Sequence, residues 1–572
     1  MLFGESTDYK INRKKSIYCS ILVGLFAIIV FLPALQNDFV TWDDQAFVIQ
    51  NSNIYTLDVK LIEWAFFNFF ASSWHPITWL SHAVDYRIWG LNPFGHHLTS
   101  ILLHGINTYL VSLLCINLLN FRNSTLTASS EIQKGWILSD RGIIVAGCIT
   151  GLLFGIHPLH VESVAWVSER KDLLCAFFYL LSLICYSAYA REALIDKDRN
   201  WLTDKRYLLS LLFFVCALFS KPMAVTLPVI LLLLDWYPFE RFNYSNLKNL
   251  FYEKLLFALF SLYVSVTVLF AQMAGESLRS FELFPFSSRI LVGGDAVIMY
   301  IKMMVWPVNL INFYPFPKEV SGVPTYFISF IGVGLITSGL LMVSKKFKAL
   351  FVVWFFYLII LFPVLGIIKG GSFAIADRYT YLPSISIFLL TGFGIAIVYD
   401  KVIKASNILK GLFLCFLIAV NLTLSFLTIK QIGVWHDTIS LWRHAIKNTS
   451  SERDDYYRRV ARMHMGLGMA YFAKGMQDEC IMEFKTALDI EPRNTDVRIS
   501  LANIYLDINK LDEAIIEFKT SIADDPKNAA IPLTYIKLSV ALHRVGRIFE
   551  AKTALMKADD LIKKNYENIA KQ

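Results

Sequence analysis

The sequence has 572 residues, of which 55% are hydrophobic and 17% charged, and its mean hydropathy is +0.49. This apolar content exceeds that of soluble globular proteins, so we expect an integral membrane protein. The formal net charge of +8 is modest and scattered along the chain, so we predict basic cytoplasmic loops and no nucleic-acid partner.

Apolar runs long enough to cross a lipid bilayer predict about eleven transmembrane helices. They begin near residues 16, 97, 142, 172, 206, 223, 252, 324, 349, 381 and 409. A further segment, 290–306, contains Asp295 and Lys302, and it is a twelfth candidate that crosses the membrane, lies along its surface or dips into it. No small-residue cleavage site follows the first apolar run, so we predict that this span is retained.

Sidedness follows from the basic loops. Lys and Arg residues are concentrated near the N-terminus and in the segments 191–206, 344–348 and 400–410. Such loops face the cytoplasm by the positive-inside rule. The first loop, residues 36–96, and the whole C-terminal part are therefore predicted to lie on the outer side.

The C-terminal part, residues 461–572, is predicted to contain about three tetratricopeptide repeats, because small and aromatic residues recur 34 positions apart. The matching positions are Leu467, Gly468, Tyr471, Phe484, Ala487 and Pro492 in the first copy, and Leu501, Ala502, Tyr505, Ala514, Phe518 and Pro526 in the second. Residues 431–460 are predicted to form a linker with partial capping helices. The predicted fold is all-α, with a polytopic membrane domain at residues 1–430 followed by a helical solenoid that binds extended peptide, self-associates or acts as a spacer.

Asp43 and Asp44 form the first candidate site, in the sequence TWDDQ just after the first span. A single aspartate there is best explained as a solvated loop residue or a helix cap. Two neighbouring carboxylates raise each other's proton affinity, so that one becomes a candidate general base. Adjacent residues of an extended chain point in opposite directions, so we expect one aspartate to face a substrate and the other to be held by the protein.

The segment HPLHVESVAWVSERKD, residues 157–172, places several polar residues between two spans: His157, His160, Glu162, Glu169, Arg170, Lys171 and Asp172. A divalent metal on His157, His160 and Glu162 is the weaker interpretation, because metal-binding histidines on a helix are usually four residues apart and this pair is three apart. Recognition of an anionic headgroup by Arg170 or Lys171 is favoured, since a cation at membrane depth needs a partner.

Further polar residues fall at span ends on the same predicted face. Lys221 and Arg378 each stand at the end of an apolar run, where snorkelling to the headgroups is the alternative explanation. The segment 74–98 contributes His75, His96 and His97, and its aromatic and polar mixture is typical of an interfacial helix. Trp306 and Tyr314 are predicted to be interfacial anchors. Because all these polar residues are predicted to lie on the outer face, we favour a polar cavity that they share.

Four motifs carry a resemblance to a known family. The paired acid, HPLHVESVAWVSERKDLL, SKPMAVTLPVILLLLDWYP and RYTYLPS occur in this order before the repeats. The chain resembles the transmembrane and tetratricopeptide-repeat family, which is similar to the C-type glycosyltransferases and the protein O-mannosyltransferases. With only about three repeats it looks like a bacterial member.

This resemblance implies inverting transfer of a hexose from a polyprenyl-phosphate donor to Ser or Thr hydroxyls on the outer face, with Asp43 or Asp44 as the base. Arg378, Lys221, Arg170 and Lys171 would hold the donor phosphate. His157, His160, Glu162, His75, His96, His97, Tyr379 and Tyr381 would line the cavity. No cofactor is implied with certainty. The location would be a bacterial inner membrane, or the endoplasmic reticulum in a eukaryote, with the repeats outside the cytoplasm and a peptide acceptor on them.

Other functions stay open on the sequence alone. The acceptor could be a lipid or a cell-envelope glycan, in which case the repeats would recruit partners. A transporter or a non-catalytic scaffold is the alternative from another class, although we find no symmetry between the two halves of the chain.

Overall fold

The computed structural model describes residues 13–126, 137–196, 200–244, 246–274, 285–315, 320, 323–367, 373–449, 456–526 and 530–570. The chain divides into two compact units, Met1–Asp437 and Thr438–Gln572. Almost all described secondary structure is helical, as predicted, and the described strands are β1 (Tyr314–Pro315) and β2 (Phe373–Ile375), which pair antiparallel.

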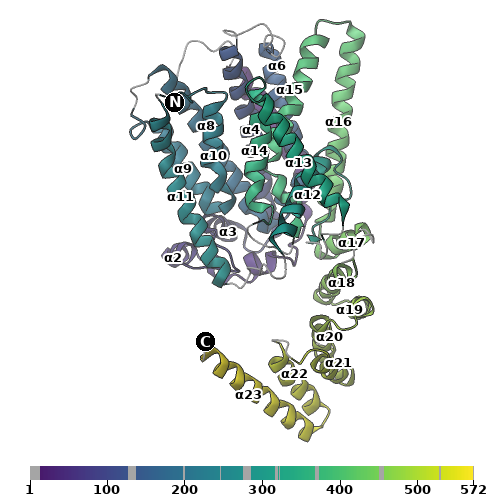
Figure 1. Ribbon diagram of the computed structural model, residues 1–572. Coiled ribbons are helices and arrows are strands. Elements are labelled where there is room, and N and C mark those ends of the chain that lie inside the picture. The colour runs from purple at the N-terminus through teal and green to yellow at the C-terminus, as the bar shows by residue number, and fades with distance from the viewer. Residues whose placement is uncertain are drawn as a thin grey trace. The chain divides into compact units, whose positions relative to one another are not determined.

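The first unit is a bundle of helices joined by short 3-10 and π turns. Its α-helices are α1 (Arg13–Phe31), α2 (Val59–Phe67), α3 (Pro76–Trp89), α4 (Pro93–Leu126), α6 (Asp140–Gly155), α7 (Val161–Ala165), α8 (Arg170–Ile195), α9 (Lys205–Ser220), α10 (Leu227–Trp236), α11 (Leu247–Ala274), α12 (Phe286–Val305), α13 (Pro324–Val343), α14 (Lys348–Leu361), α15 (Ser384–Val402) and α16 (Asn407–Val434). The turns that carry the argument below are η1 (Leu32–Gln36), η2 (Gln45–Ile49), η4 (Pro158–His160), η5 (Val167–Glu169) and η8 (Asp377–Thr380). The long helices run side by side, with α2 and α3 toward one end (Figure 1).

A helix lies at each of the eleven predicted span positions. Among the described residues, seven helices are long and apolar enough to cross a membrane, and an eighth span results if the pair Asp140–Gly155 and Pro158–Ala165, bent by 52°, counts as one. The twelfth candidate forms the single helix α12. The count of eleven spans stays a prediction.

Close helix contacts in the first unit depend on small residues. A Cβ atom on Gly24 of α1 would lie 2.7 Å from the carbonyl oxygen of Gly105 on α4, closer than van der Waals contact allows. Only glycine lets these two helices approach so far. The N-terminus of α6 is held by a side chain from α15, since Ser139 N donates to Asp400 Oδ2 at 2.7 Å.

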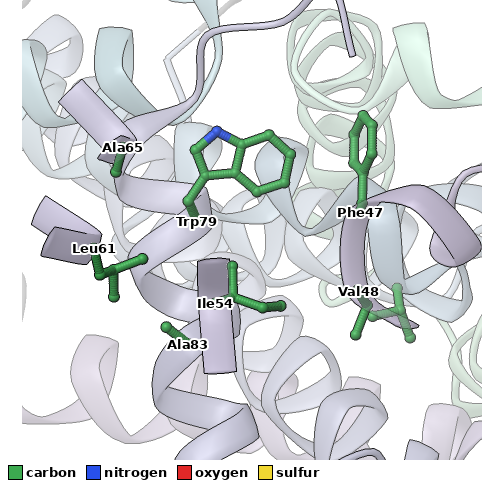
Figure 2. Close-up of a cluster of buried hydrophobic side chains, with 8 residues drawn as sticks. Phe47, Val48, Ile54, Leu61, Ala65, Trp79 and Ala83 are labelled. Carbon is green, nitrogen blue, oxygen red and sulfur yellow. The ribbon is translucent and has the colours of Figure 1, made fainter. Parts of the chain in front are cut away.

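The first loop has a hydrophobic core of its own. Residues that share this core lie on η2, on η3 (Ser52–Tyr55), on α2, on α3 and at the start of η5: Phe47, Val48, Ile54, Leu61, Ala65, Trp79, Ala83 and Val167. Figure 2 shows the Trp79 indole turned toward Phe47, and the two rings are 5.1 Å apart between centroids. Burying these groups removes a large apolar surface from water and so fixes η2, which begins directly after Asp44.

The second unit consists of antiparallel helix pairs. Its helices are α17 (Thr438–Asn448), α18 (Tyr456–Ala473), α19 (Gln477–Ile490), α20 (Thr495–Asp507), α21 (Leu511–Asp524), α22 (Ile531–Arg544) and α23 (Ile548–Ala570). Gly468 faces the Phe484 ring, and Phe518 occupies the equivalent buried position in the next pair. The predicted solenoid is thereby confirmed. Residues 527–529 and 571–572 of the predicted repeat domain lie outside the described part.

Candidate active site

Asp44 is a structural anchor of the first loop. It is 1% exposed, and its two carboxylate oxygens are both engaged. Oδ2 accepts a hydrogen bond from Val40 N at 3.0 Å, and Oδ1 accepts one from Ser168 N at 2.9 Å and another from the Ser168 hydroxyl. Burial raises the pKa of Asp44 to about 6, against the lowering effect of the Ser168 and Val40 hydrogen bonds. Both oxygens are bonded to the protein and the side chain is almost fully buried, so this carboxylate is poorly placed to receive a proton from an external substrate.

Asp43 has the opposite environment. Its carboxylate is half-buried and accepts no hydrogen bond from any side chain or amide in the described ranges. Burial raises the pKa of Asp43; Lys171 opposes this effect, Glu169 adds to it and Arg378 opposes it. Among the two predicted catalytic residues, Asp43 is therefore the one whose carboxylate is free to act.

The charges that act on Asp43 belong to a compact cluster of three cations and three carboxylates. Lys171 Nζ lies 2.9 Å from Glu169 Oε1, and Lys221 Nζ lies 3.4 Å from Glu169 Oε2. Arg378 Nε lies 3.5 Å from Glu169 Oε1, so that Glu169 is the centre of the cluster. Lys221 also pairs with Asp172, and Arg378 pairs with Glu162.

The cluster is held rigidly but is not sealed. Glu162 Oε2 also accepts a hydrogen bond from the backbone N–H of Arg378, at 2.9 Å, which fixes the start of η8. The side chains of Lys171, Lys221 and Arg378 remain 11%, 12% and 8% exposed. Each of the three cations therefore keeps a small exposed surface, which fully covered Arg170 does not.

Aromatic rings flank the three cations. The Arg378 guanidinium lies 5.4 Å from the Trp166 ring centroid and 5.0 Å from the Tyr379 ring centroid. Lys171 Nζ lies 5.0 Å from the Phe47 centroid, and Lys221 Nζ lies 5.9 Å from that of Tyr379. Such contacts stabilise a cation where water is scarce. Tyr379 thus lies beside the cluster, and its role as a cavity residue stays a prediction.

Arg170 does not belong to this cluster of cations and carboxylates. Its side chain is 0% exposed, pairs with Asp85 and donates from Nη2 to the carbonyl oxygen of His96 at 2.6 Å. This arginine ties the start of α8 to α3 and α4. The expectation that Arg170 holds a donor phosphate finds no support in its position, because a ligand cannot reach a fully covered guanidinium.

The predicted histidines are buried structural residues. His157 donates from Nε2 to Met304 O at 3.0 Å, and its Nδ1 accepts from Leu159 N. His160 lies 2.7 Å from Phe154 O through Nδ1 and 3.1 Å from Ser384 Oγ through Nε2. Both ring nitrogens of each are occupied by the protein, so neither offers a lone pair to a metal. No group of three or more His, Cys, Asp and Glu side chains in the described ranges is arranged to hold a metal ion.

The remaining predicted cavity residues surround the cluster without joining it. His75 packs beside Trp79, His96 Nε2 lies 3.0 Å from Gly90 O, and His97 lies beside the backbone of Asn37 and Asp38. The Tyr381 hydroxyl lies 2.8 Å from His104 Nδ1 inside the helix bundle. Their positions indicate support of the fold.

Two further residues near Arg378, Asp377 and Tyr314, were not predicted from the sequence to belong to the site. Asp377 is 3% exposed, and Tyr314, which the sequence suggested as an interfacial anchor, is hydrogen-bonded to it and accepts from Ile311 N at 2.9 Å. Burial raises the pKa of Asp377 well above its usual range, and Glu162 adds to this. The β1–β2 pair brings these residues together, and no sequence signal connects them.

The arrangement has the parts required for transfer of a group from a phosphate to a hydroxyl. A carboxylate that accepts no hydrogen bond from the described residues stands near cations that are paired with carboxylates and remain partly exposed. The carboxylate can accept a proton, and the cations can stabilise negative charge that develops on a departing phosphate.

Comparisons with known proteins agree with the two-part architecture. A family model for the tetratricopeptide repeat matches residues 471–531. The chain is 24% identical over 508 residues to human "Protein O-mannosyl-transferase TMTC4", covering 81% of this chain and 65% of the relative. It is 32% identical over 154 residues to "Protein O-mannosyl-transferase Tmtc1" of Drosophila melanogaster, covering 27% of this chain and 14% of the relative.

The chain therefore spans about two thirds of the human relative and a small part of the fly one. A solved structure described as "Crystal structure of APC/C hetero-tetramer Cut9-Hcn1" aligns over 82% of this chain and 97% of that chain, with 14% identity and a TM-score of 0.19, too low to indicate a shared overall fold. The chain is a homologue of the TMTC proteins that are named protein O-mannosyl-transferases, and its C-terminal unit carries tetratricopeptide repeats.

Proposed function

We propose that this chain is a membrane glycosyltransferase that moves mannose or another hexose from a polyprenyl-phosphate donor to Ser or Thr hydroxyls of protein substrates. The observation that carries the proposal is the Asp43 carboxylate, which lies free of hydrogen bonds beside the cluster of Lys171, Lys221 and Arg378. The printed names of the relatives support protein as the acceptor.

Asp43 is the general base in this proposal. As the acceptor hydroxyl attacks the anomeric carbon, its proton passes to the Asp43 carboxylate, the bond from the anomeric carbon to the phosphate oxygen breaks, and the configuration inverts. Asp44 holds the neighbouring backbone in place through Val40 and Ser168. The pair thus divides into a base and an anchor, which supports the assignment of Asp43 over Asp44.

Lys221, Lys171 and Arg378 bind the donor phosphate. Glu162, Glu169 and Asp172 prevent these side chains from moving, so that their charges are already in position when the phosphate departs. Fixed charges of this kind stabilise a transition state without reorganisation. The donor's polyprenyl chain extends into the bilayer, and the N-terminus is cytoplasmic with the repeats on the outer side of a bacterial plasma membrane.

The decisive experiment compares two single substitutions in the purified full chain. Polyprenyl-phosphate mannose and a Ser/Thr-rich peptide are the substrates, and intact mass reports the added hexose. Asp43→Asn lowers the rate of transfer by about 10²- to 10⁴-fold in this proposal, whereas Asp43→Glu retains more of it. Full activity of Asp43→Asn, with correct folding, would remove Asp43 as the base.

A second measurement tests the acceptor. Intact-mass glycoproteomics of the cell envelope with and without the gene should show loss of hexose from Ser and Thr peptides. If hexose occupancy on all Ser and Thr peptides is unchanged and sugar is lost from a lipid or an envelope glycan instead, that lipid or glycan is the acceptor. Unchanged sugar on every class would favour a scaffold or transporter.

A further inference from the structure

The last residues of the first unit contact the first loop. Helix α16 ends at Val434, and His436 O accepts a hydrogen bond from Asp38 N at 2.8 Å. One turn earlier, Ile432 O accepts from Asn37 Nδ2 at 3.3 Å. The segment through which the chain leaves the first unit is thus attached to the loop a few residues before Asp43.

The same exit segment contacts the turn that precedes α8. The Trp435 ring stacks on the Trp166 ring with centroids 5.5 Å apart and planes 24° apart, and each of the two residues is 2% exposed. Trp166 stands two residues before Ser168, which donates both its N–H and its hydroxyl to Asp44. The exit segment therefore contacts residues that stand two positions before each partner of Asp44, namely Asp38 before Val40 and Trp166 before Ser168.

These contacts close a ring of three segments. Residues 435–436 contact Asp38, Asp44 joins Val40 to Ser168, and Trp166 returns to Trp435. Asp43 directly precedes Asp44 in this ring. Its backbone carbonyl accepts a hydrogen bond from Phe47 N at 2.8 Å, and its carboxylate accepts none from the described residues. The ring therefore holds the backbone that carries the Asp43 side chain, and the exit segment contributes the Trp435 ring to it.

The ring also reaches the cations. The Trp166 ring also has the Arg378 guanidinium 5.4 Å and Lys171 Nζ 5.8 Å from its centroid. A tryptophan held by a stacked partner keeps a fixed plane, and a fixed plane keeps the cations that rest on it in place. Trp435 therefore acts on the base and on the phosphate-binding cations through Trp166 and Asp38.

We propose that Trp435 is a positioning residue, which sets the place of Asp43 relative to Arg378 and Lys171. The kinetic consequence of this proposal rests on the proposed function, whereas its structural consequence rests on geometry alone. Trp435 belongs to the first unit, which ends at Asp437.

Hydrogen–deuterium exchange of the full chain in nanodiscs tests the structural part without reference to any activity. In Trp435→Ala, peptides that contain the amides of Asp38, Val40 and Ser168 should exchange on the order of tenfold faster. Trp435→Phe, which keeps a stacking ring, should exchange close to wild type. Trp306→Ala, whose side chain is exposed, is the control and leaves all three amides unchanged. Unchanged exchange of these amides in Trp435→Ala overturns the inference.

Kinetics test the positioning role. In Trp435→Ala, kcat should fall about 10- to 100-fold, since a shift of about 1 Å in a catalytic group has such effects, while KM for donor and acceptor stays within about twofold. Trp435→Phe should restore most of kcat. The acidic limb of the pH–rate profile should move to lower pH in Trp435→Ala, because a looser loop exposes Asp43 to water. A loss of active enzyme alone would lower kcat without moving this limb, and that result would contradict positioning.

The two proposals fail in different ways. Absence of hexose transfer by the folded wild-type chain would overturn the proposed function, while faster exchange in Trp435→Ala would still support the ring. Transfer by the wild type with unchanged exchange and unchanged kinetics in Trp435→Ala would keep the function and overturn the role of Trp435.

Discussion

Asp44 and Ser168 lie 124 positions apart in the sequence and are joined by two hydrogen bonds, one from the Ser168 backbone N–H at 2.9 Å and one from its hydroxyl. This contact attaches the first loop to the beginning of α8. It places Asp43 next to the residues that follow Ser168, which include Glu169 and Lys171. The division between an anchoring and a free aspartate follows from this one contact.

Removal of the free carboxylate should affect turnover and not stability. We expect Asp43→Asn to lower kcat by about 10²- to 10⁴-fold, the usual contribution of a general base. The thermal midpoint should not change, because no described residue donates a hydrogen bond to this carboxylate. Peptide glycosylation by intact mass and a thermal-shift assay in detergent check the two parts. A lowered midpoint with a matching loss of kcat would indicate a structural aspartate.

Disruption of the Asp44 anchor, unlike removal of the Asp43 carboxylate, should lower the stability of the protein. Asp44→Asn replaces one acceptor oxygen by an NH₂ group that faces the N–H of Val40 or Ser168. We therefore expect the free energy of unfolding to fall by about 1–3 kcal/mol. Ser168→Ala removes one hydroxyl donor and should cost about 1 kcal/mol. Ser73→Ala, in the same loop, removes only an exposed hydrogen bond to Ala71 O and serves as the control. Denaturant or thermal unfolding of the full chain in detergent measures the three; equal stability of all three variants would contradict the anchor.

Two buried arginines should respond differently to replacement by lysine. In Arg378→Lys the charge remains but the fork that contacts Glu162 and Glu169 is lost, so we expect donor affinity to fall about tenfold or more. Arg170→Lys alters a fully covered pair with Asp85 and should lower the thermal midpoint without a selective change in donor affinity. Binding of a short-chain polyprenyl phosphate by calorimetry distinguishes them. A larger affinity loss in Arg170→Lys would reassign the phosphate site.

The pH dependence of transfer should report the environment of Asp43. Burial raises the pKa of this carboxylate, and the base acts only when it is deprotonated. The rate should therefore rise with pH through an acidic limb that lies above the ordinary aspartate pKa of about 4. Replacement of Lys171 by Met removes a cation that lowers the pKa of Asp43, so its limb should lie at higher pH than that of the wild type. An acidic limb at the ordinary value in both proteins would contradict a buried base.

The repeat array should be sensitive where its helices touch. A Cβ atom on Gly468 would lie 2.7 Å from the Phe484 ring, so Gly468→Ala should destabilise the array by about 1–3 kcal/mol. Lys485→Ala, on the exposed face of the same helix pair, is the control. Denaturant unfolding followed by circular dichroism measures both. Equal unfolding midpoints would show that α18 and α19 can move apart at this point without loss of stability, which would contradict the prediction.

Much of the fold could be predicted because it depends on local pattern. Apolar runs mark helices in a bilayer, and the 34-residue recurrence marked by Gly468, Tyr471, Phe484 and their counterparts is a property of the chain itself. The all-α class, the order of the two parts and the repeat type were therefore within reach. Span count and element ends were not, since η turns and the 52° bend after Gly155 leave no distinct hydropathy signal.

The candidate site likewise has features that the local sequence predicts and features that only the tertiary structure shows. By itself the sequence determined that Asp43, Lys171, Lys221 and Arg378 stand at span ends, because charge in an apolar chain is conspicuous. Only the tertiary structure decided that Asp44 binds Ser168, that Arg170 is covered by Asp85, and that Trp435 stacks on Trp166. The physical reason is that hydropathy and periodicity describe neighbours along the chain, whereas the free or bound state of a charged side chain depends on partners that are tens to hundreds of residues away.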